Sequence, residues 1–133
     1  MRRERLSARE GGGMKIAVVG VCCSGKTTLV EGLRSQGYDA YSVAQEHSGA
    51  KSMWARRRPD VLVVLDCEYE TVRKRRSVPW GPQYLREQRY RLRHAREHCD
   101  LYIKTDHMTP QEVLKTVLEE IGGSRHVHNG EER

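Results

Sequence analysis

The stretch Gly20-Val21-Cys22-Cys23-Ser24-Gly25-Lys26-Thr27 fits the phosphate-binding loop pattern G-x-x-x-x-G-K-[ST] at every fixed position. Its neighbours fit a loop of this kind as well. Residues 15–19 form a short apolar run typical of a buried strand, and residues 26–35 carry apolar side chains at helical spacing before Gly37. A chance match in a glycine-bearing turn would lack both neighbours. The sequence therefore predicts a strand, a phosphate-binding loop, and a helix whose first amides face the phosphate.

The residue types in this stretch suit a nucleoside triphosphate bound with Mg²⁺. Loop N–H groups would bind the β-phosphate, Gly25 would allow close approach, Lys26 would reach the β- and γ-phosphate oxygens, and the Thr27 hydroxyl would coordinate Mg²⁺. Thr28 is expected near the α-phosphate. We therefore expect ATP and Mg²⁺ as cofactors. The predicted nucleotide-binding residues are Gly20, Cys22, Cys23, Ser24, Gly25, Lys26, Thr27 and Thr28.

The chain has 133 residues and a formal net charge of +6, and this length suits one domain with a single core. The charge is local, because residues 73–96 hold nine Lys or Arg against one acid, Glu87. Such a segment favours an anionic partner. Residues 1–13 and 122–133 are rich in charge and glycine without apolar periodicity. We predict that both ends are disordered and that the domain covers residues 14–121.

No apolar run reaches the roughly 18 residues that a membrane span needs. The arginine-rich N-terminus is not followed by an apolar stretch, as it would be in a signal peptide. We therefore expect a cytoplasmic protein without a membrane partner. The four cysteines include no C-x-x-C pair, which argues against a zinc ribbon or a disulfide framework and favours reduced thiols.

Two acids follow predicted strands and are candidates for supporting Mg²⁺. A strand over residues 39–44 delivers Gln45, Glu46 and His47 to its carboxyl end, the edge where ligands bind in a parallel sheet. Glu46 could hold Mg²⁺ or accept a proton from a substrate hydroxyl; alternatively, it is an exposed acid that caps the next helix. The continuous apolar strand over residues 61–66 ends in Asp66, which is a second Mg²⁺ candidate or a structural residue.

The remaining pattern predicts helices and one more strand. We predict a short helix over residues 50–58, another over 69–76, a hinge at 77–82, a helix over 83–98, a strand over 101–104 and a helix from Pro110 to Ile121 that Gly122 ends. Along the 83–98 helix, the apolar side chains share one arc and a row of arginines shares the next. A solvated charged face is the simpler explanation of that row. Its members are Arg86, Arg89, Arg93 and Arg96.

The same helix contains His94-Ala95-Arg96-Glu97-His98, which matches the H-x-x-E-H metalloprotease pattern. Both histidines fall on the arc opposite the apolar one, and only about 35 residues follow to supply a third ligand. We therefore interpret them as surface histidines.

Four strands that alternate with helices predict an α/β fold of three layers with a short, mostly parallel sheet. Residues 61–121 resemble the C-terminal half of small-molecule P-loop kinases such as the shikimate, gluconate, cytidylate and adenylate kinases. In those enzymes a strand ending near "LD" leads into a helix with a terminal arginine, an arginine-bearing lid, and a last strand and helix. The stretches GKTTLVEGL and GYDAYSVAQEHS resemble the NadR-type P-loop ATPases.

The resemblance implies a P-loop NTPase fold and an ATP-dependent phosphotransferase. Lys26 would neutralise phosphate charge, Glu46 would orient an acceptor, and residues 77–98 would form a lid. The lid arginines would be Arg86, Arg89 and Arg93, with Arg75 or Arg76.

The sequence departs from these kinases between the second strand and the "LD" strand, where residues 45–60 leave no room for an acceptor-binding insertion. The alternative is a nucleotide-binding module without kinase activity, which presents the basic helix to a partner or, less favoured, to nucleic acid. The only asparagine is Asn129, so no N-K-x-D guanine motif exists. ATP is therefore expected rather than GTP.

Overall fold

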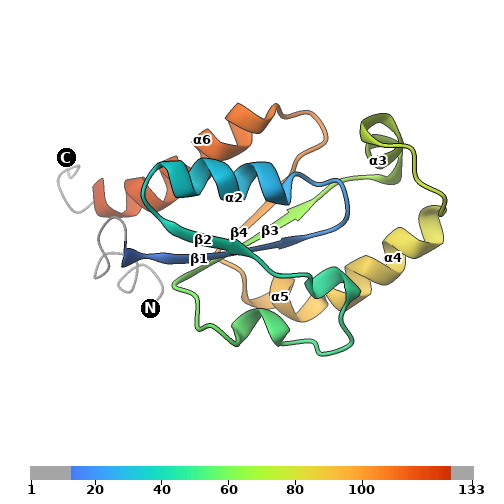
Figure 1. Cartoon of the computed structure of the whole chain (residues 1–133), viewed down its shortest axis with the longest axis horizontal. Helices are drawn as coiled ribbons and strands as arrows, with labels where there is room; N and C mark the ends of the chain where they lie inside the picture. Colours follow the sequence, from blue (N-terminus) through green and yellow to red (C-terminus); the bar gives the residue numbers. More distant parts are fainter. Residues whose placement is uncertain (1–12, 127–133) are drawn as a thin grey trace.

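The computed structural model describes residues 13–126, and within this range four parallel strands form the middle layer of the molecule (Figure 1). The strands lie in the order β2-β1-β3-β4, and Val18 of β1 pairs with both Ser42 of β2 and Val63 of β3. An all-parallel sheet covered on both faces explains the continuous apolar runs in its two central strands. The strands are β1 (Lys15–Gly20), β2 (Asp39–Ser42), β3 (Val61–Asp66) and β4 (Leu101–Lys104).

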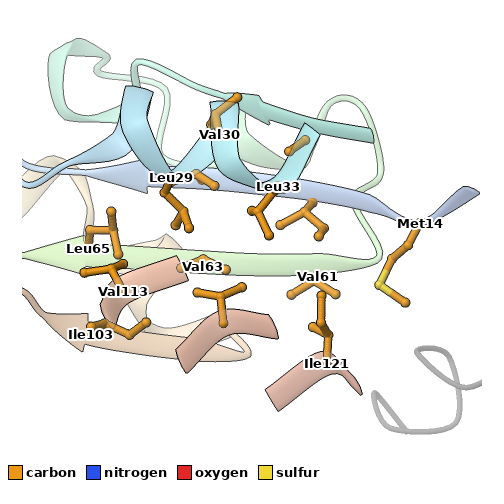
Figure 2. Packing of buried hydrophobic residues seen from close by; sticks show 14 residues of the cluster. Met14, Leu29, Val30, Leu33, Val61, Val63, Leu65, Ile103, Val113 and Ile121 are labelled. Atoms are coloured by element: carbon orange, nitrogen blue, oxygen red, sulfur yellow. The ribbon is translucent and has the colours of Figure 1, made fainter. Parts of the chain in front are cut away.

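Helices α2 (Lys26–Ser35) and α6 (Pro110–His126) cover one face of the sheet. Figure 2 shows side chains of both helices meeting those of β3, with Leu33 and Ile121 near Val61. The two helices approach closely at Gly32, where a Cβ would lie 2.8 Å from Leu114. As predicted, α2 ends before Gly37, which adopts a φ of +94°. The structure confirms the predicted helix that follows the glycine-rich loop.

Helices α4 (Pro82–Arg91) and α5 (Arg93–His98) cover the opposite face, and α3 (Tyr69–Arg75) lies at the carboxyl end of β3 (Figure 1). The apolar arc predicted for residues 83–98 is buried here, with Leu85, Leu92 and Ala95 in a second core. The chain is therefore an α/β protein with helices on both faces of a parallel sheet.

Two predicted helices differ in the structure. The segment over residues 50–58 contains only the single 3₁₀ turn η3 (Met53–Ala55), because Trp54 alone is buried and Arg58 adopts a left-handed φ of 54°. The predicted helix over 83–98 is divided at Leu92 (φ −94°, ψ 0°), where the backbone tightens while the side chain stays buried. Neither predicted helix contains a proline or glycine that would account for the difference.

Helix α6 begins as predicted. The Thr109 hydroxyl accepts from the Glu112 N–H at 3.1 Å, and the Glu112 carboxylate accepts from the Thr109 N–H at 2.8 Å, which is a capping box. Its predicted end is wrong, because the helix continues past Gly122 to His126. The predicted disordered tail is therefore helical over 122–126, and both the rest of that tail and residues 1–12 lie outside the described range. Within residues 13–126, no helix is long and apolar enough to cross a membrane.

Candidate functional site

The loop over residues 20–27 joins β1 to α2 at the carboxyl edge of the sheet. Gly20 and Gly25 are each required in this loop for a different physical reason. A Cβ at Gly20 would lie 2.5 Å from the Leu65 carbonyl oxygen, so only glycine lets β1 and the end of β3 come this close. Gly25 adopts a φ of +106°, which other L-residues rarely adopt. Ser24 closes the turn by donating its hydroxyl to the Val21 carbonyl at 2.7 Å.

Lys26, the first residue of α2, turns back over this loop. Its ammonium donates to the Gly20 carbonyl at 2.7 Å and to the Glu46 carboxylate, also at 2.7 Å. Glu46 lies in the 3₁₀ turn η2 (Gln45–His47) that follows β2, and it is 4% exposed. Its second oxygen, Oε1, is buried and has no hydrogen-bond partner among the described residues. The predicted pair of Lys26 and Glu46 is therefore brought together, and the carboxylate keeps one free oxygen.

Neighbouring residues hold η2 in place. The Gln45 side chain is fully buried, donates to the Ala50 carbonyl at 2.7 Å and accepts from the Trp54 N–H at 2.9 Å. Arg91 donates to the Glu46 carbonyl at 3.2 Å. The bonds of Gln45 and Arg91 thus fix the backbone of Glu46 and so the position of its buried carboxyl group.

Asp66, the other predicted metal ligand, has its side-chain oxygens engaged elsewhere. Oδ1 accepts from the Cys67 N–H at 2.8 Å and from the Arg89 guanidinium at 3.1 Å, and Oδ2 accepts from the Tyr102 hydroxyl at 2.6 Å. Burial and this bond raise the pKa of Tyr102 to about 12. These contacts fit the structural interpretation of Asp66.

The predicted arginine row does not act as one unit. Arg89 pairs with Asp66, and the guanidinium of Arg96 lies 4.1 Å from the centre of the Tyr102 ring. Arg86 and Arg93 instead line a pocket of about 660 Å³ between residues 48–51 and α4. Lys51 and Arg91 line it too, with one acid, Glu87. Four basic side chains there favour an anion.

Two pockets border the loop over residues 20–27. One, of about 370 Å³, is polar and contains most of the predicted phosphate ligands. Its lining residues are Cys22, Cys23, Gly25, Lys26, Thr27, Thr28, Arg75 and Arg76. The second, of about 300 Å³, shares Cys23, Gly25, Thr28 and Arg75 with the first and adds the apolar side chains of Leu29, Met108, Pro110 and Val113. Together they form a polar region continuous with an apolar one.

Several contacts that position the loop were not predicted from the sequence. Gln88 of α4 is fully buried; its carbonyl oxygen accepts from the Cys22 N–H at 2.8 Å, and its amide donates to the Cys22 thiol at 3.3 Å. Arg75 donates to the Cys23 carbonyl at 2.8 Å, and Thr105 donates to the Ser24 carbonyl at 3.0 Å. For Gln88 the signal was its place on the apolar arc of α4, where an amide needs a partner.

The H-x-x-E-H histidines are not gathered around a metal position. His94 accepts from the Trp54 indole N–H at 3.1 Å, and the Nδ1 of His98 lies 2.9 Å from the His94 carbonyl oxygen. Burial lowers the pKa of His94, and the nearby charge of His98 lowers it further. The bond from the Trp54 indole to the His94 ring is therefore a packing contact and not part of a metal site.

No protein-family model matches the sequence, and a comparison with curated proteins found no match. The function is therefore argued from the residues and their geometry.

Proposed function

We propose that this chain is a P-loop protein that binds ATP with Mg²⁺ at the loop over residues 20–27 and transfers a phosphoryl group to an anionic acceptor. The observation that carries the proposal is the position of Lys26. Its ammonium lies over the loop, within 2.7 Å of both a loop carbonyl and a buried carboxylate. Among the described residues, this arrangement best suits a cation that must meet phosphate oxygens.

The two pockets beside the loop fit the parts of a nucleotide. The polar pocket of about 370 Å³ offers loop N–H groups, Lys26 and two arginines to the phosphates. The adjoining pocket of about 300 Å³ offers Met108, Pro110 and Val113 to a planar base. Thr28 lines both pockets, which suits its expected position near the α-phosphate.

The oxygen donors of the site fit Mg²⁺. Thr27 is exposed in the polar pocket, and Glu46 keeps a buried oxygen without a partner. Oxygen ligands of this kind are what Mg²⁺ prefers. When bound, the ion would neutralise charge on the β- and γ-phosphate oxygens. Glu46 would hold it or orient the acceptor, and Lys26 would stabilise the transferred group.

The basic pocket between residues 48–51 and α4 is our candidate acceptor site. It is connected to Glu46 through Arg91, which lines the pocket and donates to the Glu46 carbonyl at 3.2 Å. Arg86 and Arg93 would attract an acceptor that already carries phosphate or carboxylate. An acceptor of this kind requires no separate inserted domain, which the short segment over residues 45–60 could not supply.

A second candidate function is a nucleotide-binding module without kinase activity. The observation that favours it is the packing of α4 and α5, whose Leu85, Gln88 and Ala95 are buried. Because the Gln88 side chain accepts from the Cys22 N–H, a nucleotide bound at the loop over residues 20–27 would directly change a contact of α4. The helix would then pass this signal to a partner at its basic outer face.

Calorimetry with Mg-ATP tests the nucleotide site. We expect Lys26→Gln to weaken ATP binding at least about tenfold, because an amide cannot supply the charge that phosphate oxygens need. Lys26 belongs to neither apolar core, so the fold should be kept. Lys115→Gln on the exposed side of α6 is the matched control and should bind ATP normally. Equal ATP affinities for native protein and Lys26→Gln would overturn the proposal.

Turnover separates the two functions. Release of ADP from Mg-ATP would be measured alone and with a panel of phosphorylated or carboxylated alcohols. For a phosphotransferase, we expect one class of acceptor to raise the rate at least about tenfold, and Arg86→Gln with Arg93→Gln to remove that increase. Tight ATP binding with no acceptor effect would instead support the binding module.

A further inference from the structure

Three metal-binding side chains meet where the loop over residues 20–27 contacts η2. The Cys22 thiol lies 3.7 Å from Nε2 of His47, and the Glu46 carboxylate oxygen Oε2 lies 3.6 Å from the same nitrogen. The three ligand atoms all lie within 4.8 Å of one another. They come from two segments that are more than 20 residues apart in the chain, so no local sequence pattern brings them together.

These separations are close to those around a tetrahedral zinc ion. With Zn–S near 2.3 Å and Zn–N and Zn–O near 2.0–2.1 Å, tetrahedral angles place the ligand atoms about 3.4–3.6 Å apart. The two measured separations involving His47 are 3.6 and 3.7 Å. These two separations match the tetrahedral values to within a few tenths of an ångström, and the ligand atoms of Cys22 and Glu46 lie within 4.8 Å of each other.

The carboxylate in this cluster has binding capacity to spare. Glu46 is 4% exposed, and its Oε1 is buried without a hydrogen-bond partner among the described residues. A buried carboxylate oxygen in that state is costly, and a bound cation would remove the cost. The Cys22 thiolate and the Glu46 carboxylate would bring two negative charges to a divalent ion, and the carboxylate shares its charge with the Lys26 ammonium, 2.7 Å from Oε2.

The ligands are oriented by two residues one turn apart on α4. The Tyr84 hydroxyl lies 3.1 Å from Nδ1 of His47, so when Nδ1–H donates to Tyr84, the Nε2 lone pair is free for a metal. The Gln88 amide donates to the Cys22 thiol at 3.3 Å. Metal-binding histidines in proteins usually have such a partner on the second nitrogen.

We propose that Cys22, Glu46 and His47 form a binding site for Zn²⁺ or a similar borderline-soft divalent ion, with the fourth position open to water. A thiolate and an imidazole are poor ligands for Mg²⁺ and good ones for Zn²⁺, so this ion differs from the Mg²⁺ of the proposed function, with which it would share Glu46. Bound there, Zn²⁺ ties the loop over residues 20–27 to η2. The site needs no nucleotide, so its test is independent of ATP binding.

The test is titration of the chelator-treated, nucleotide-free full chain with Zn²⁺ in a calorimeter and with Co²⁺ in a spectrophotometer. We expect one high-affinity Zn²⁺ ion and a thiolate-to-Co²⁺ charge-transfer band. Cys22→Ala should abolish that band. Cys22→Ala and His47→Ala should each weaken Zn²⁺ binding at least about a hundredfold, whereas Tyr84→Phe should weaken it about tenfold. Because the His47 side chain is 45% exposed, His47→Ala should fold normally.

The control variants remove other candidate ligands. His94→Ala with His98→Ala, and separately Cys99→Ala, should leave both the Zn²⁺ affinity and the charge-transfer band unchanged. The proposal is overturned if the native protein shows no charge-transfer band. It is also overturned if Zn²⁺ affinity survives Cys22→Ala or His47→Ala, whatever the His94/His98 variant shows.

Discussion

The ammonium of Lys26 and the carboxylate of Glu46 lie 2.7 Å apart, and their side chains are only 16% and 5% exposed. Removing two charges from water costs about as much as their attraction returns, so a buried pair of this kind is weak support for stability. The position of this pair over a glycine-rich loop is better explained by a functional role than by a contribution to stability. Each side chain positions the other: the Lys26 ammonium donates to Glu46, and Glu46 holds the lysine over the loop.

Glu46→Gln should separate turnover from binding. The amide keeps the shape of the side chain, but its neutral oxygen binds Mg²⁺ more weakly than a carboxylate and cannot act as a base. We expect turnover with Mg-ATP to fall about a hundredfold, with an ATP dissociation constant within a few-fold of the native value. Steady-state kinetics and calorimetry would measure the two quantities.

Asp66→Asn is the comparison for that experiment. Because Asp66 pairs with Arg89 and accepts from Tyr102, we expect a loss of about 1–3 kcal/mol in the free energy of unfolding. Turnover per folded molecule should be nearly native. If Asp66→Asn abolished turnover and Glu46→Gln did not, the two carboxylates would have to exchange roles.

Gln88→Leu should strengthen ATP binding. In the structure the Gln88 carbonyl oxygen accepts from the Cys22 N–H at 2.8 Å, a donor that phosphate needs. Displacing a hydrogen bond of this kind costs about 1 kcal/mol, so its removal should lower the ATP dissociation constant about fivefold. Leucine suits a fully buried position among apolar residues.

The matched control is Gln111→Leu on the exposed side of α6, which should leave ATP affinity unchanged. Weaker ATP binding by Gln88→Leu would mean that the glutamine organises the bound state rather than competing with it.

Gly20→Ala should destabilise the fold. The added Cβ would lie 2.5 Å from the Leu65 carbonyl oxygen, which is backbone and cannot turn aside. We expect a loss of about 1–3 kcal/mol, the usual range for overpacking, measured by urea unfolding. Gly49→Ala meets nothing within 4 Å and adopts no positive φ, so its free energy of unfolding should change by less than about 0.5 kcal/mol.

Structure that depends on neighbouring residues could be predicted from the sequence. The run from Val61 to Asp66 and the capping box at Thr109 are local patterns, and both are confirmed. The parallel sheet followed from the alternation of strands and helices. Contacts between distant residues were missed, such as Gln88 with Cys22, which are 66 residues apart.

Two further differences show the same limit. The helix over residues 83–98 divides at Leu92 without a proline or glycine, and the Leu92 side chain is buried at that point. Arg89 belongs to a row of four arginines by spacing, but it pairs with Asp66 on a neighbouring strand. Helical spacing locates a side chain on a face, and tertiary packing decides its partner.

Stability should depend on pH through His94. Burial lowers its pKa from 6.5, with the charge of His98 adding to the effect, and the neutral ring accepts from Trp54. The folded state therefore binds this proton less readily than the unfolded chain, so the contribution to stability is present above pH 6.5 and is lost as the pH falls toward the lowered pKa.

Urea unfolding at pH 7.5 and 5.5 would measure this effect. We expect His94→Gln to flatten the decrease toward pH 5.5, whereas His107→Gln, at an exposed position, should leave the decrease intact. An unchanged pH dependence in His94→Gln would show that other groups cause it.

Hydrogen exchange should locate the segment that responds to nucleotide. We expected residues 77–98 to close as a lid, and the structure places buried Leu85, Leu92 and Ala95 in that segment. Arg75 and Arg76 line the polar pocket, and residues 77–81 join them to α4. We therefore expect Mg-ATP to slow exchange at least about fivefold over residues 75–84, because guanidinium contacts to phosphate fix this connection. Exchange within α5 should hardly change.

Nucleic acid, the alternative partner of Arg86 and Arg93, would give a different result. If Arg86 and Arg93 bind nucleic acid, an oligonucleotide should bind without ATP, and its affinity should fall steeply as salt rises, because phosphate contacts release counterions. We expect weak oligonucleotide binding, since Tyr90 is the one large apolar side chain that the described residues expose strongly, and single strands need several aromatic rings to stack upon. Exchange over residues 75–84 that ignores Mg-ATP, together with salt-sensitive oligonucleotide binding, would assign this surface to nucleic acid.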